Sequence, residues 1–320
     1  MTAPAVAIVS LAVALVTTPL AIVVARRTGI MDQPGTLKSQ TVAIPYLGGI
    51  GVFAGLAVGV LNGRPSVLVP LAAGLLLGVA DDRFDIPPLP RLAGELGIGA
   101  AVVVTCPVHL AGYVAVLLLV PVTVLLINGV NLLDGLDMLA GGVAAVAAVG
   151  FAVILHGPGR SMAVALGAAL AGFLVFNRPT ARIYLGDGGS YLLGTALAVL
   201  LARTWAPHVA VSTGAAALAL VAIPVAEVAC AVIRRLRAGR SLMTGDRGHP
   251  YDHLVIRGWP RILASAAYIG MELLLTAAVI FAVHRSSLRV AVIVDVLAAI
   301  VLVAAAAGTG ALSADQEAHT

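Results

Sequence analysis

Charged residues are unusually scarce in this chain. Only 11% of its 320 residues are Asp, Glu, Lys or Arg, whereas 60% are hydrophobic and the mean hydropathy is +1.06. Ordinary soluble domains contain about 25% charged residues, so this composition excludes that class. The sequence therefore predicts a polytopic integral membrane protein, with the lipid bilayer as its surroundings.

Cysteine is nearly absent as well. Cys106 and Cys230 fall at the end of one apolar run and inside another, a pattern that offers no disulfide framework and favours two small apolar side chains. A cleavable signal peptide is not expected, because the basic pair Arg26 and Arg27 follows the first apolar run instead of preceding it. The net charge of +4 mostly reflects membrane topology and does not predict a nucleic-acid partner.

Hydrophobic residues gather in eleven runs of a length that can cross a bilayer, some of them short or tilted. Because these runs do not alternate as barrel strands do, we expect helices that satisfy their own backbone. The predicted fold class is all-α, with about eleven transmembrane helices in one domain of residues 1–310 and a short polar tail, 311–320. The runs are 4–24, 48–61, 66–80, 92–106, 111–127, 137–155, 161–176, 188–202, 209–233, 262–283 and 287–307.

The distribution of basic residues predicts how these helices are oriented in the membrane. Cytoplasmic loops of membrane proteins are enriched in Lys and Arg, so the pair after the first run places the N-terminus outside. Counting onward puts fourteen basic residues in cytoplasmic gaps and five in external ones. Nine of the eleven aspartates also fall in cytoplasmic gaps and none in an external gap, which predicts one site built from several cytoplasmic loops.

The stretch 128–142 has the densest polar pattern. Asn128, Asn131, Asp134 and Asp137 recur every third residue between two apolar runs. In a continuous helix such a series drifts about 60° per step, so a helix end, a loop and a new helix start fit better. An ordinary turn uses the same residue types, and that reading stays open for this loop alone.

Two further gaps carry aspartates that are candidates for a cation site. Asp81 and Asp82 stand at a helix C-terminus, where the helix dipole disfavours them, so they need a positive partner: either Arg83 or Arg91 in a structural network, or a divalent cation or cationic substrate cluster. Asp187, flanked by glycines, is either the N-cap of the next helix or a magnesium ligand beside a phosphate on that helix N-terminus.

Three basic side chains are candidates for binding phosphate. Lys38 is the only lysine; it is either a topological charge or a compact ammonium for a phosphate. Arg247 and His249 fit an anion-contacting pair, and a zinc site formed by His249 and His253 has too few ligands to be favoured.

In the long run 209–233, Pro224 predicts a kink. Three acids inside apolar runs, Glu95, Glu272 and Asp295, are functional candidates without assigned partners.

Together these motifs resemble the polyprenyl-phosphate N-acetylhexosamine-1-phosphate transferases, a bacterial-type family that includes enzymes of cell-envelope glycan synthesis. The similarity covers roughly residues 30–260. It rests on the family order of Asp32-x-Pro34 with Lys38, Pro45-x-x-Gly48-Gly49, Asp81-Asp82-Arg83-Phe84-Asp85, Asn128-x-x-Asn131-x-x-Asp134-Gly135-x-Asp137, Asn177, and Gly186-Asp187-x-Gly189-Ser190-x-x-x-Gly194.

The resemblance implies a reaction. An undecaprenyl or decaprenyl phosphate attacks the β-phosphate of a UDP-N-acetyl sugar, giving polyprenyl-diphosphate-sugar and UMP with Mg2+, or Mn2+ as an alternative, at the cytoplasmic face of the cell membrane. It also implies roles: Asp187 as metal ligand; Asp81, Asp82, Lys38 and Asp134 as catalytic residues; and Asn128, Asn131, Asp137, Asn177, Arg247 and His249 as substrate-binding residues.

The chain departs from the family pattern at three places. Gln40 replaces a frequent histidine, Met138 replaces the glycine of an Asp-Gly-Leu-Asp-Gly-Leu pattern, and the histidine-rich loop is reduced to residues 249–253. This loop argues against a peptidoglycan precursor as donor, and the Asp81–Asp85 motif favours N-acetylglucosamine. A transporter or flippase of a phosphorylated lipid or nucleotide sugar, and a non-catalytic family member, are the alternatives, and a homodimer is left open.

Overall fold

The computed structural model describes residues 1–33, 42–242 and 248–312; Lys38, Gln40 and Arg247 lie outside them. The described chain is almost entirely helical, apart from a two-stranded antiparallel hairpin that pairs Met31 with Pro45. The elements are α1 (Ala3–Thr28), β1 (Met31–Asp32), β2 (Ile44–Pro45), α2 (Gly48–Leu61), η1 (Pro65–Val67), α3 (Leu68–Phe84), α4 (Pro88–Thr105), α5 (Gly112–Leu133), α6 (Leu139–Ile154), α7 (Gly157–Asn177), α8 (Gly186–Thr204), α9 (Val211–Ala216), η2 (Ala217–Val221), α10 (Ala222–Arg237), α11 (Pro250–Ile256), α12 (Arg261–Arg285) and α13 (Leu288–Thr309).

The protein is an all-α, multi-pass membrane protein, as its composition predicts. Six helical stretches of the described chain are long and apolar enough to cross a membrane: α1, α5, α7, the stretch Val211–Arg237, α12 and α13. Each of the eleven predicted apolar runs overlaps a helix. The number of crossings and the orientation of the N-terminus stay predictions.

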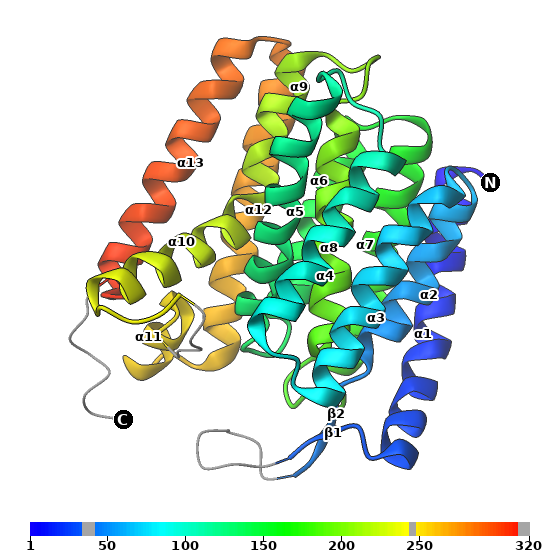
Figure 1. The fold of residues 1–320 in the computed structure, drawn as a ribbon, viewed down its shortest axis with the longest axis vertical. Helices are drawn as coiled ribbons and strands as arrows, with labels where there is room; N and C mark the ends of the chain where they lie inside the picture. The colour runs from blue at the N-terminus through cyan, green and yellow to red at the C-terminus, as the bar shows by residue number, and fades with distance from the viewer. Residues whose placement is uncertain (34–41, 243–247, 313–320) are drawn as a thin grey trace.

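The run 209–233 changes direction near Pro224, as the sequence predicts, but it is divided into three helical segments. It begins as α9, tightens into the 3-10 segment η2 and continues as α10, which runs across the long axis of the bundle (Figure 1). Pro224 cannot donate a backbone hydrogen bond, so the regular helical pattern is interrupted in the turn that precedes it. The break therefore lies in Ala217–Val221, ahead of the proline.

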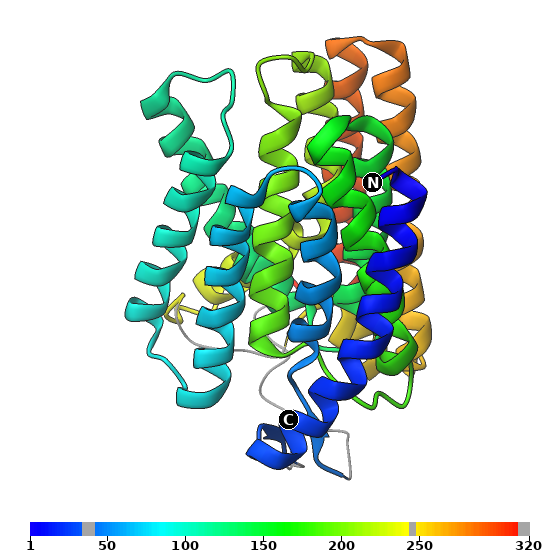
Figure 2. The same cartoon turned by 90° about the vertical axis from the view of Figure 1, so that its right-hand side faces the viewer.

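Helix α8 lies in the middle of the bundle, buried along almost its whole length. Figure 2 shows it between α2 and α3. Glycines allow its backbone to approach its neighbours: Gly78 of α3 lies against Asp187, and Gly49 of α2 lies against Gly189. Small residues at helix contacts are the usual means of close packing in membranes, and here they fix the start of α8 relative to α2 and α3.

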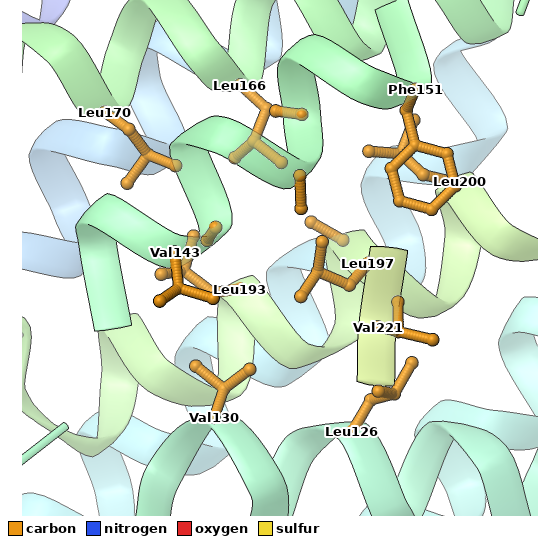
Figure 3. Packing of buried hydrophobic residues seen from close by; sticks show 14 of the residues in the cluster. Leu126, Val130, Val143, Phe151, Leu166, Leu170, Leu193, Leu197, Leu200 and Val221 are labelled. Atoms are coloured by element: carbon orange, nitrogen blue, oxygen red, sulfur yellow. The ribbon is translucent and has the colours of Figure 1, made fainter. Parts of the chain in front are cut away.

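The apolar core joins α8 to α5, α6 and α7. Figure 3 shows side chains from these four helices and from η2 meeting in one cluster: Leu126, Val130, Val143, Phe151, Leu166, Leu170, Leu193, Leu197, Leu200 and Val221. All of them are buried, so the helix ends that carry the polar residues are held on a closely packed support.

Three residues differ in position from the sequence prediction. Asn128 and Asn131 belong to the last turns of α5 and not to a loop, because the helix continues to Leu133. Asp187 stands inside the first turn of α8, after Leu185 and Gly186, and is not the residue that precedes the helix. Only Asp134 and Asp137 of the 128–137 series lie in the connection between α5 and α6.

Candidate active site

A cavity of about 790 Å³ opens where α3 and α5 end and α8 begins, at the end of the bundle that also carries the β1–β2 hairpin and α11 (Figure 1). Segments far apart in the sequence meet there. Eight of the residues proposed from the sequence line it: Asp81, Asp82, Asn131, Asp134, Asp137, Asn177, Asp187 and His249. The prediction that several polar gaps form one site is therefore supported by their position.

Asn128 is not among the cavity-lining residues. Its Nδ2 donates to Oε2 of Glu95 at 2.7 Å and to the carbonyl of Val124 at 2.9 Å. Asn128 precedes Asn131 by nearly one helical turn of α5, so it lies deeper in the bundle and faces α4. The geometry thus gives Asn128 a partner within the protein, and the substrate-binding role that the resemblance implies for it stays a prediction.

The carboxylate of Asp82 accepts hydrogen bonds from the start of α8. Its Oδ1 lies 3.0 Å from the backbone nitrogen of Asp187, and its Oδ2 lies 3.1 Å from that of Gly188. Unpaired N–H groups at a helix start need acceptors, and Asp82 supplies them from another helix. From the sequence we expected these amides to be free for a phosphate; instead, they are paired with Asp82.

Asp81 is held by the turn between α3 and α4. Its Oδ1 accepts the backbone N–H of Ile86 at 2.9 Å, and its Oδ2 accepts the hydroxyl of Tyr191 at 2.6 Å. The guanidinium of Arg91 lies 3.5 Å from the same Oδ2. Of the two arginines considered from the sequence, Arg91 is therefore the one that compensates Asp81, and it also lies 3.7 Å from Glu95.

Asp187 faces the cavity beside Asn131. The amide Nδ2 of Asn131 lies 2.6 Å from Oδ1 of Asp187 and 3.2 Å from Oγ of Ser190. The Asp187 side chain makes no capping bond at the start of α8, so the N-cap interpretation is wrong. An amide that donates to one oxygen leaves the other oxygen of the carboxylate available to a ligand.

Asp134 and Asp137 lie in the loop between α5 and α6. Burial, followed by the negative charges of Asp187 and Asp82, raises the pKa of Asp134 well above its ordinary value. Burial also raises the pKa of Asp137, although the N–H of Ala181 donates to its Oδ2 at 3.2 Å and the guanidinium of Arg261 opposes the shift. Carboxyl groups thus crowd on one wall of the cavity, and a cation bound there would favour their ionised forms.

Asn177 holds the loop between α5 and α6 in its conformation. Its Oδ1 accepts the backbone N–H of Met138 at 2.8 Å, and its Nδ2 donates to the carbonyl of Ile183 at 2.9 Å. Met138 has a positive φ of 66°, in the left-handed region that favours glycine. This conformation gives a physical reason why the family pattern has glycine at the position that Met138 occupies.

His249 enters the cavity from the segment before α11. Its Nδ1 lies 3.1 Å from Oε2 of Glu227 on α10, and its ring stacks on Tyr251 with centroids 5.3 Å apart. The hydroxyl of Tyr251 donates to the carbonyl of Leu132 at 2.8 Å. The imidazole is therefore fixed against both α10 and the end of α5.

Sequence reasoning missed the tyrosines. The chain has only six, and five of them belong to the site: Tyr46, Tyr184 and Tyr251 line the cavity, whereas Tyr191 and Tyr268 donate to the carboxylates of Asp81 and Glu227. Burial raises the pKa of Tyr184 to about 12, which keeps it a neutral donor. The clue available in the sequence was the clustering of a scarce residue type near the polar motifs.

Sequence reasoning also missed Arg261. This residue lines the cavity, but from the sequence it was counted only as a basic residue that indicates membrane topology.

Among the residues that the structure describes, no three His, Cys, Asp or Glu side chains form a ready-made metal cage. Mg2+ does not require one, because it usually binds through one or two carboxylates and completes its shell with water and substrate phosphates. The carboxylates of Asp187 and Asp134, crowded on one wall of the cavity, fit that pattern.

Comparison with known proteins identifies the family of this chain. Residues 65–204 match the model of glycosyl transferase family 4. The chain is 32% identical to the undecaprenyl-phosphate alpha-N-acetylglucosaminyl 1-phosphate transferase of Salmonella typhi, over 73% of this chain and 71% of the relative. It is 27% identical to a probable undecaprenyl-phosphate N-acetylglucosaminyl 1-phosphate transferase of Bacillus subtilis (78% and 76%) and 28% identical to the decaprenyl-phosphate N-acetylglucosaminephosphotransferase of Mycobacterium tuberculosis (72% and 70%). The chain therefore belongs to glycosyl transferase family 4, the family that its motifs resemble.

Proposed function

We propose that this protein transfers N-acetylglucosamine-1-phosphate from UDP-N-acetylglucosamine to a polyprenyl phosphate and releases UMP. The observation that carries the proposal is the meeting of Asp81, Asp82, Asp134 and Asp187 in one cavity at the end of a membrane bundle. The names of the relatives supply the acceptor class and the sugar. The proposed location is the cell membrane, with the cavity on its cytoplasmic side.

In this reaction a phosphate oxygen of the lipid attacks the β-phosphorus of the nucleotide sugar. A new P–O bond forms, the bond between the β-phosphorus and the bridging oxygen breaks, and UMP leaves with the electron pair. Phosphoryl transfer needs mainly alignment and compensation of negative charge. A cavity rich in carboxylates repels phosphates unless cations are present, so the proposal includes Mg2+.

Asp187 is the proposed principal ligand, with Asp134 beside it. A bound Mg2+ would neutralise negative charge on the diphosphate. Asn131 orients the carboxylate of Asp187 through its hydrogen bond. Asp82 holds the first turn of α8, and through it Asp187, while Asp81 is held by Tyr191 and Arg91.

The remaining groups serve the substrates. Asp137, Asn177 and His249 line the cavity and would contact the nucleotide sugar, and Lys38 and Arg247 are proposed to neutralise phosphate. The polyprenyl tail would enter from the bilayer, since the cavity opens at the end of membrane-spanning helices. Residues 1–310 act as one catalytic domain in this proposal.

The test is UMP release by the purified protein in detergent, supplied with undecaprenyl phosphate, Mg2+ and, in separate reactions, UDP-N-acetylglucosamine and other UDP-N-acetyl sugars. We expect UMP only when lipid, metal and UDP-N-acetylglucosamine are all present, and none after EDTA. A folded sample that releases no UMP with any sugar would overturn the proposal. Transport of the lipid or sugar into liposomes without UMP would favour a transporter instead.

A further inference from the structure

Glu227 is a buried acid to which the proposed reaction assigns no part. It lies on α10 with only 2% of its surface exposed. Both of its oxygens are engaged: Oε2 with Nδ1 of His249 at 3.1 Å, and Oε1 with the hydroxyl of Tyr268 at 2.8 Å. Burying a carboxylate is costly unless it is hydrogen-bonded, so the position of Glu227 is tied to these two partners.

The contact with Glu227 determines which nitrogen of His249 is available. A carboxylate can only accept a hydrogen bond, so Nδ1 must carry the proton that it shares with Glu227. The ring lines the cavity, which leaves Nε2 as the nitrogen for a ligand there. The parallel stack on Tyr251, with an interplanar angle of 4°, restricts rotation of the ring.

Helix α10 holds the same segment at a second point. The guanidinium of Arg234, two turns beyond Glu227, donates to the carbonyl of Gly248 at 2.5 Å. Arg234 is also buried, with 4% of its surface exposed. One helix therefore fixes both the backbone just before His249 and the imidazole itself.

We propose that Glu227 is a positioning residue that aims Nε2 of His249 at a phosphate oxygen of a substrate in the cavity. This inference rests on the proposed function and deepens it. A ring between a carboxylate and a phosphate oxygen donates to both only as imidazolium, so the pair presents a fixed cationic donor on a wall rich in carboxylates. His249 contacts the substrate, and Glu227 acts through it.

The experiment is a double-mutant cycle with Glu227→Gln, His249→Gln and the two combined, in full-length protein in detergent. The measurements are kcat, the KM for each substrate by UMP release, and the dissociation constant of UDP-N-acetylglucosamine by calorimetry. Because a hydrogen bond to a charged group is lost, we expect each single variant to raise one KM about tenfold. The combined variant should be no weaker than His249→Gln alone, since Glu227 has no route to the substrate without the imidazole.

The substrate whose KM rises identifies which phosphate His249 contacts. A rise confined to UDP-N-acetylglucosamine, with a matching rise in its dissociation constant, assigns the contact to the diphosphate of the donor. A rise confined to undecaprenyl phosphate assigns it to the phosphate of the lipid. Unchanged KM values in Glu227→Gln, or an equal loss from this change with and without His249, would overturn the inference.

Two further variants separate positioning from simple folding defects. Tyr268→Phe removes the second hydrogen bond to Glu227 and adds no bulk, so we expect a smaller rise in the same KM, absent when His249 is glutamine. Glu272→Gln is the matched control, because Glu272 is also fully buried but has no hydrogen-bond partner in the described part of the chain and does not line the cavity. It should leave both KM values unchanged. Wild-type protein that releases no UMP would overturn the proposed function and this inference with it.

Discussion

Asn131 and Asp187 meet in the lining of the cavity, with 2.6 Å between the amide nitrogen of the first and a carboxylate oxygen of the second. They come from the end of α5 and the start of α8, which pack against each other through Gly194 and Ile127. The contact orients the carboxylate of Asp187 without cancelling its charge, because an amide is neutral. This carboxylate therefore keeps its full attraction for a cation.

The first prediction concerns Asp187→Asn. The amide has the same shape but no charge, so we expect Mg2+-dependent UMP release to fall at least about 100-fold, the usual loss when one group that stabilises a transition state is removed. The measurement is UMP release across a Mg2+ titration, with thermal unfolding in detergent to confirm the fold. Activity equal to wild type would exclude Asp187 as the metal ligand.

The second prediction compares two glycine substitutions. A methyl group added at Gly78 would overlap the carbonyl of Asp187, so Gly78→Ala should separate α3 from α8, lower the stability by about 1–3 kcal/mol and reduce turnover. Gly97, inside α4, has no atom within 4 Å of the added methyl group. Gly97→Ala should therefore be neutral or slightly stabilising. Thermal unfolding and UMP release of the two variants test this, and equal effects would contradict the packing argument.

The third prediction is a pH effect at Asp134. Its pKa is raised in the folded protein, whereas in the unfolded chain it is about 3.9. As the pH rises above that value, the unfolded chain loses this proton first, so Asp134 lowers the stability of the fold progressively up to its folded pKa, by at most about 1.4 kcal/mol per pH unit.

Asp134→Asn removes this pH-dependent loss of stability. In EDTA, its thermal unfolding temperature relative to wild type should therefore increase from pH 5 to pH 8. A difference that does not change with pH would show that Asp134 has an ordinary pKa in the folded state. Addition of Mg2+ should reduce the difference, because the cation stabilises the ionised carboxylate.

The fourth prediction concerns the positive φ of Met138. Glycine adopts this conformation without the steric cost of a Cβ, which is about 1 kcal/mol. Met138→Gly should therefore raise the free energy of unfolding, whereas Met138→Ala keeps the strained backbone and loses side-chain contacts. Thermal unfolding in detergent distinguishes the two, and a glycine variant no more stable than the alanine variant would show that Met138 is unstrained.

Much of the fold was predictable because membrane helices depend on local composition. Each apolar run became helical, and Asp81 and Asp82 stand at a helix end as expected. The boundaries were less accurate. Asn131 was placed in a loop because Asn is common in turns, but packing against α8 and the bond to Asp187 extend α5 beyond it.

The sequence by itself determined the membrane class, the family and the set of polar residues that gather at one end of the bundle, because hydrophobic length and residue type act locally. Only the tertiary structure decided which of these residues are partners: Asp82 with the start of α8, Asp81 with Tyr191, and Glu227 with His249. These pairs are separated by 22 to 110 residues along the chain. Their contacts arise from the way whole helices pack, and no local pattern encodes that packing.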